Sequence, residues 1–135
     1  MRMVSIASGS SGNCIYIGSE STHILVDAGI SNKRIVQGLN EIGLKDGEMD
    51  GILITHEHSD HIKGLGVLSR KHHLPIYGTQ ATLDEIASTA SLGAIDRELL
   101  HPIFPDVDFS LGDLTIKAFS IDHDAADPVA YRVKN

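Results

Sequence analysis

Cysteine, aromatic residues and long apolar runs are all scarce in this 135-residue sequence. Cys14 is the single cysteine, so no disulfide can form within the chain, which fits a reducing compartment. Tryptophan is absent and aromatic residues make up 4%, so leucine, isoleucine and valine must provide most of the core. The first residues lack the apolar segment of a signal peptide, and no run is long enough to span a bilayer. These absences favour a cytoplasmic protein that does not bind membranes.

The composition that remains is that of a globular protein. Hydrophobic residues make up 41% and charged residues 21%, and the length suits one domain with one modest core. The formal net charge is −7, which argues against a surface that binds nucleic acid over its whole extent. The charge still allows a local basic stripe, and bound divalent metal ions would add positive charge where a substrate lies.

Short β-prone runs alternate with helical segments, and this alternation predicts an α/β fold. Ser31 is predicted to cap a helix that ends near residue 43, and residues 62–71 are predicted to be helical. Thr82 and Glu85 form a capping-box pattern and predict the start of a third helix. The predicted strands are residues 4–7, 14–17, 23–26, 51–55, 74–77, 107–111, 114–121 and 128–133.

Three of these predicted strands end at side chains that can bind or support a metal. Asp27 follows the third strand, His56 follows the fourth, and His123 follows the seventh between two aspartates. In open α/β sheets, functional groups gather beyond the carboxyl ends of the strands. We therefore expect these side chains to share one site.

The segment His56-Glu57-His58-Ser59-Asp60-His61 carries the strongest chemical signal. His56 and His58 are one residue apart, so both rings can face the same side of an extended segment. Asp60 and His61 follow in a tightening turn and can bind a second ion close by. Imidazole and carboxylate ligands suit zinc, and also manganese or iron.

His123 is the candidate for a third imidazole beside His56 and His58. Three histidines with an open position make a catalytic site, in which the metal turns bound water into hydroxide near neutral pH. Asp27 can orient the histidine segment, or it can cap the turn at Ala28-Gly29 that directly follows Asp27. Both roles stay open. The Ser8–Asn13 loop can offer backbone N–H groups to a phosphate or form a flexible turn.

The segment His56-x-His58-x-Asp60-His61 resembles the signature motif of the metallo-β-lactamase superfamily. Asp27, within Leu25–Gly29, resembles its first motif, and His123 resembles its third. The wider sequence is similar to the bacterial YycJ/WalJ group through essentially the whole chain. The stretches that carry this similarity are Ser8–Asn13, Thr55–Gly64 and His123–Val129.

This resemblance implies an αββα sandwich, in which two mixed sheets pack together with helices outside. It also implies a centre of two divalent ions, zinc or manganese with iron as a third option. His56, His58 and His123 would hold one ion, and Asp60 and His61 would hold the other and take part in catalysis. The group is associated with exonuclease action on DNA. The expected function is therefore a metal-dependent hydrolase, a phosphodiesterase or DNA exonuclease that uses a metal-activated hydroxide.

The superfamily takes a bridging aspartate and a further histidine from motifs that would lie beyond residue 135. Residues 1–135 are therefore expected to form mainly the N-terminal half of the sandwich, to bind one metal well and to have little or no activity alone. An exposed apolar sheet face is expected to drive dimerisation. Two alternatives stay open: a thioesterase or lactonase on the same fold, and a metal-stabilised regulatory module without catalytic activity.

Overall fold

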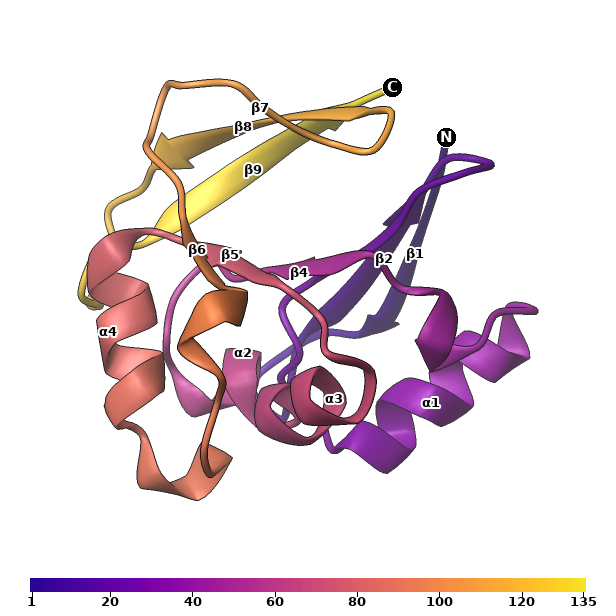
Figure 1. Cartoon of the computed structure of the whole chain (residues 1–135), viewed down its shortest axis with the longest axis horizontal. Coiled ribbons are helices and arrows are strands. Elements are labelled where there is room, and N and C mark those ends of the chain that lie inside the picture. Colours follow the sequence, from indigo (N-terminus) through magenta and orange to yellow (C-terminus); the bar gives the residue numbers. More distant parts are fainter.

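A computed structural model describes residues 1–135 as three stacked layers (Figure 1). A six-stranded sheet lies in the middle, helices cover one of its faces, and a three-stranded sheet covers the other. The predicted α/β class is confirmed.

The central sheet is mixed, and its strands follow one another in sequence order from β1 to β6. The first three strands are antiparallel neighbours, whereas β3, β4, β5 and β6 run parallel. The parallel strands place their carboxyl ends at one edge of the sheet, and this edge carries the candidate site. The strands are β1 (Arg2–Ala7), β2 (Cys14–Gly18), β3 (His23–Val26), β4 (Gly51–Leu53), β5 (Ile76–Gly78) and β6 (Leu100–Pro102).

The helices occur where the chain crosses between the parallel strands. The first of them begins as predicted, since the Ser31 hydroxyl accepts a hydrogen bond from the backbone N–H of Arg34. Its residues Ile35 and Leu39 are buried against the sheet. The helices are α1 (Asn32–Glu41), α2 (Ser59–Ile62), α3 (Leu65–His72) and α4 (Gln80–Ser88), with 3₁₀ turns η1 (Asp46–Glu48), η2 (Ala90–Leu92) and η3 (Arg97–Leu99).

Two helix predictions differ from the structure. The predicted helix over residues 62–71 is split into α2 and α3 near Gly64, where a side chain would lie 2.2 Å from the Ile30 carbonyl oxygen. The predicted cap at Thr82 is wrong, because α4 begins at Gln80 and Thr79 occupies its cap position. Thr82 instead lies fully buried inside the helix, with its hydroxyl 3.0 Å from that of Thr79.

The central sheet contributes to a core on each face. Ile52 of β4 packs in the larger cluster, which lies between the sheet and the helices. Its neighbour Leu53 points the other way, into the cluster shared with the smaller sheet. A strand buried on both faces reads as a continuous apolar run, which is why the sequence identifies this strand so clearly.

The smaller sheet is antiparallel, and its strands are β7 (Phe109–Leu111), β8 (Leu114–Ser120) and β9 (Val129–Lys134). Leu114 and Ile116 point inward to the core. On the opposite face Lys117 lies across from Arg132, and both cations contact the Phe119 ring. The outer face of this sheet therefore carries both charged and aromatic side chains, whereas an apolar face was expected. Dimerisation stays a prediction, and this face gives it no support.

None of the helices is long and apolar enough to cross a membrane.

Candidate metal centre

The candidate site lies where β3, β4 and β8 end. Asp27 directly follows β3, the histidine motif (residues 56–61) follows β4, and the His123 loop (residues 121–128) joins β8 to β9. The two sheets converge at this edge, because the Val129 N–H donates to the Thr55 carbonyl at 2.9 Å. Side chains that are distant in sequence therefore meet beyond the strand ends, as the sequence predicts.

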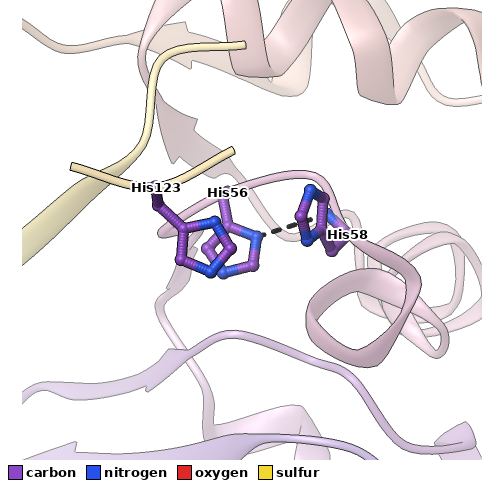
Figure 2. A group of neighbouring side chains, drawn as sticks. All are labelled: His56, His58 and His123. Carbon is purple, nitrogen blue, oxygen red and sulfur yellow. Dashed lines mark hydrogen bonds between the residues drawn. The ribbon is translucent and has the colours of Figure 1, made fainter. Parts of the chain in front are cut away.

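Three imidazoles gather at the centre of this site (Figure 2). One ring nitrogen from each of His56, His58 and His123 lies within 4.8 Å of the other two. The His56 ring is stacked against His123, with 4.5 Å between centroids, and meets the His58 ring edge-on at 4.6 Å. His56 is buried, His58 is half-buried and His123 is exposed, so the cluster opens toward solvent on one side.

The cluster suits a divalent cation. Burial lowers the pKa of His56, and the nearby imidazoles His61, His123 and His58 lower it further, while Asp27 acts in the opposite direction. A neutral imidazole offers a lone pair to a metal at neutral pH. Two nitrogens on one tetrahedral zinc ion lie about 3.4 Å apart. The ring nitrogens, which lie within 4.8 Å of one another, thus need to approach by about 1 Å to share one ion.

Asp60 and His61 form a second group beside the first. Both lie in α2, and the His61 Nε2 atom is 3.4 Å from a carboxylate oxygen of Asp60. The His61 ring also lies against His56, with 3.9 Å between centroids. The structure therefore brings all five predicted ligands into one place, three in the first group and two in the second.

Asp27 supports the second group through hydrogen bonds to His61 and Thr55. Its buried carboxylate lies 2.6 Å from His61 Nδ1 and accepts bonds from the Thr55 N–H at 2.8 Å and the Thr55 hydroxyl at 2.7 Å. A carboxylate can only accept, so Nδ1 carries the proton, and in the neutral ring Nε2 keeps its lone pair and faces the side-chain amide nitrogen of Asn13 at 3.3 Å. Burial lowers the pKa of His61, but the hydrogen bond and charge of Asp27, with the charge of Asp60, outweigh it and raise that pKa.

The sequence did not indicate that Asn13 belongs to the site. Its side-chain amide nitrogen lies 3.3 Å from Asp60 Oδ2 and 3.3 Å from His61 Nε2. Its backbone N–H donates to the Asp60 carbonyl at 2.8 Å. A side chain on Gly29 would lie 1.7 Å from that carbonyl, so only glycine allows these loops to approach so closely. The Ser8–Asn13 loop is thus packed against the motif, and the Gly12-Asn13 pair in this loop was the one signal of that contact in the sequence.

The other histidines lie outside this site. His23 contacts the Tyr16 hydroxyl at 2.6 Å, and His72 contacts Asp46 at 2.7 Å. His101 is stacked on Tyr77 at the far edge of the parallel strands. These three side chains therefore make their contacts away from the metal centre.

Solved structures share this arrangement of layers. The Rm3 metallo-β-lactamase superposes with a TM-score of 0.81 over 96% of this chain and 52% of its own, at 17% sequence identity. The architecture is therefore the metallo-β-lactamase fold, a fold whose members use divalent metal ions. Residues 22–135 match the family described as the Beta-lactamase superfamily domain, and the chain belongs to this family.

Two curated relatives extend the comparison to sequence. The exodeoxyribonuclease WalJ of Streptococcus pneumoniae is 42% identical over 127 residues, which cover 94% of this chain and 47% of the relative. The exodeoxyribonuclease YycJ of Bacillus anthracis is 40% identical over 130 residues, covering 96% and 48%. The resemblance inferred from the motifs is confirmed. The chain spans about half the length of the curated relatives it matches.

Proposed function

We propose that this chain forms part of a metal-dependent DNA exonuclease, a phosphodiesterase of the β-lactamase superfamily. The observation that carries the proposal is the convergence of His56, His58 and His123 beside Asp60 and His61 at the strand ends. The similarity to relatives named exodeoxyribonucleases supports DNA as the substrate. We also place the protein in the cytoplasm, where chromosomal DNA lies in bacteria such as those of the relatives.

The two groups of side chains have separate roles in this proposal. His56, His58 and His123 would hold one divalent ion, and Asp60 with His61 would contribute to a second. Zinc, manganese and iron all accept such nitrogen and oxygen ligands. Only two ligands of the second ion come from residues 1–135, so we propose that the remaining ligands lie outside them. When bound, the ions supply an activated water and stabilise charge on the phosphate oxygens.

The residues of the chain do the positioning. Asp27 fixes the tautomer of His61, so its Nε2 lone pair stays directed into the site. The closely packed backbone between Asn13 and Asp60 holds the second group against the first. Because His58 and His123 lie on the open side of the cluster, a phosphodiester can approach from solvent there.

A cleavage assay under single-turnover conditions tests the proposal. The chain, in excess and loaded with Mn²⁺ or Zn²⁺, is incubated with end-labelled single-stranded and duplex DNA, RNA and acyl-glutathione. We expect slow release of nucleotides from a DNA end, lost in His58→Ala and kept in His101→Ala. Faster hydrolysis of the thioester would assign the chain to the thioesterase branch. Absence of metal-dependent and His58-dependent DNA cleavage would refute catalysis by this chain.

A further inference from the structure

The His123 loop must be held in place for His123 to reach the other two histidines. Ile121 and His123 are both exposed, and the loop between β8 and β9 contains no helix or strand of its own. Its ends are tied together, since the Ile121 N–H donates to the Pro128 carbonyl at 3.2 Å. This bond closes the loop, but it does not direct the loop toward the histidine motif. That direction must come from contacts with other elements.

One such contact comes from Glu57, which lies between His56 and His58 in the motif. Both carboxylate oxygens of Glu57 face the backbone N–H of Ala126, at 3.0 and 3.3 Å. A carboxylate that accepts a backbone N–H makes a charge-assisted hydrogen bond, which is stronger than a neutral one. The residue between two of the histidines thus bonds directly to the loop that carries the third.

The second contact comes from Thr79, the cap residue of α4, and from Thr82 within that helix. The Thr79 Oγ1 atom lies 2.9 Å from the Asp127 carbonyl oxygen, and the Thr82 Oγ1 atom lies 3.4 Å from it. Both threonines are buried, at 2% and 0% exposure, so the loop carbonyl meets hydroxyl donors in an environment without competing water. Thr79 occupies the cap position of α4, yet its side chain makes no capping bond to that helix. Its hydroxyl serves the loop instead.

We infer that Glu57 is a positioning residue for metal binding, which acts by holding the His123 loop, and that Thr79 holds the same loop through Asp127. Glu57 itself stays outside the group of nitrogen ligands, because its carboxylate is engaged with Ala126. The inference rests on the proposed function in one respect, since it takes His123 as a metal ligand. It adds a reason for an acidic residue between His56 and His58.

The test measures metal affinity, with no need for activity. Zn²⁺ binding to the chain is followed by competition with a chromophoric chelator, and Co²⁺ spectra report the geometry of the ligands. We expect Glu57→Ala to weaken Zn²⁺ binding about tenfold, the lower range for groups that orient ligands. Glu57→Gln keeps a carbonyl acceptor and should weaken it less. Glu41→Ala removes the same charge from the end of α1 and serves as the matched control.

A second pair of variants tests the contact between Thr79 and the Asp127 carbonyl. Thr79→Val preserves the shape of the side chain but removes the hydroxyl, so it should weaken binding, whereas Thr79→Ser should restore it. Circular dichroism and thermal unfolding without metal confirm that each variant is folded. Parental affinity in both Glu57→Ala and Thr79→Val, with weakened binding in His123→Ala, would overturn the positioning role alone.

A double-mutant cycle separates positioning from direct participation. If Glu57 acts through His123, then Glu57→Ala should cause no further loss in a His123→Ala background. An equal loss in both backgrounds would show that Glu57 acts on the metal independently of the loop, and this would overturn the inference. Parental affinity in His123→Ala itself would remove His123 from the site, and the proposed metal centre would fail with it.

Discussion

Replacement of Asp27 by alanine gives the sharpest test of how the site is supported. Asp27 is 4% exposed, and its carboxylate meets three donors at 2.6–2.8 Å, two from Thr55 and one from His61. Hydrogen bonds to a charged group contribute about 1.5–3 kcal/mol each, so the three bonds would contribute about 5–9 kcal/mol if they were fully additive. This sum is an upper limit for the loss of stability. Breaking a buried charged pair costs about 3–5 kcal/mol once the site relaxes. Asp27 also has a φ of 65°, where alanine adds about 1 kcal/mol.

We therefore expect Asp27→Ala to lower the free energy of unfolding by about 4–6 kcal/mol, measured by urea denaturation with a chelator present. Asp27→Asn tolerates the same φ and keeps one acceptor, so about 1–2 kcal/mol is expected. Asp50 is the matched control, because it flanks the other end of β3 and accepts a single bond from the His23 N–H at 2.8 Å. Asp50→Ala should cost about 1 kcal/mol. An equal loss in Asp27→Ala and Asp50→Ala would refute the reasoning.

Three further predictions concern groups outside the metal ligands. Burial raises the pKa of the Cys14 thiol to about 12, so at pH 8 its thiolate fraction should be roughly a thousandfold below that of a free cysteine. Alkylation of Cys14 at pH 8 should be slow for this reason, and rapid labelling of the native chain would contradict the prediction. Burial of Asp46 opposes ionisation, but hydrogen bonds from Lys71 and His72 outweigh it and lower its pKa. The contribution of Asp46 to stability is therefore present above about pH 4 and is lost as the pH falls through the lower folded-state pKa. In Asp46→Asn, the free energy of unfolding measured by urea denaturation should fall less steeply as the pH is lowered below about 4. Tyr131→Phe removes a 2.7 Å bond to a buried backbone carbonyl beyond β4 and should cost about 1–2 kcal/mol in the same assay, whereas an unchanged midpoint would contradict the role of that bond.

The sequence predicts those elements whose pattern is local. The strand His23–Val26 is observed with the predicted bounds, because four β-prone residues lie between a turn and Asp27. The helix after Ser31 also agrees, since its cap and its apolar face are both visible in the sequence. The predicted strand at residues 51–55 is shorter in the structure, where β4 ends at Leu53. Thr55 leaves the sheet because its backbone and side chain both bond to Asp27.

Elements that depend on distant partners could not be predicted in this way. The strand β6 is only Leu100–Pro102, and parallel pairing with β5 alone defines it. It ends in proline, which signals a strand edge at best. The capping-box pattern at Thr82 was misleading for a similar reason, because its hydroxyl lies near Thr79 and the Asp127 carbonyl, which is 45 residues away.

The same distinction between local patterns and distant contacts applies to the candidate site. The metal-competent side chains of the histidine motif could be found from their residue types and spacing, since coordination chemistry restricts both. The contacts that hold them could not be found, because they join residues far apart in the chain. Asn13 and Asp60 are 47 residues apart, and Glu57 and Ala126 are 69 residues apart. Only the fold brings these pairs together.

Elemental analysis of bound metal tests the central claim most directly. The purified chain is loaded with Zn²⁺, freed of excess metal, and measured beside His56→Ala and His123→Ala, with His101→Ala as the matched control. The three-histidine centre predicts about one tightly bound ion per chain, lost in the first two variants and kept in the third. A parent chain without metal, or a His123→Ala variant that keeps its ion, would contradict the centre described above.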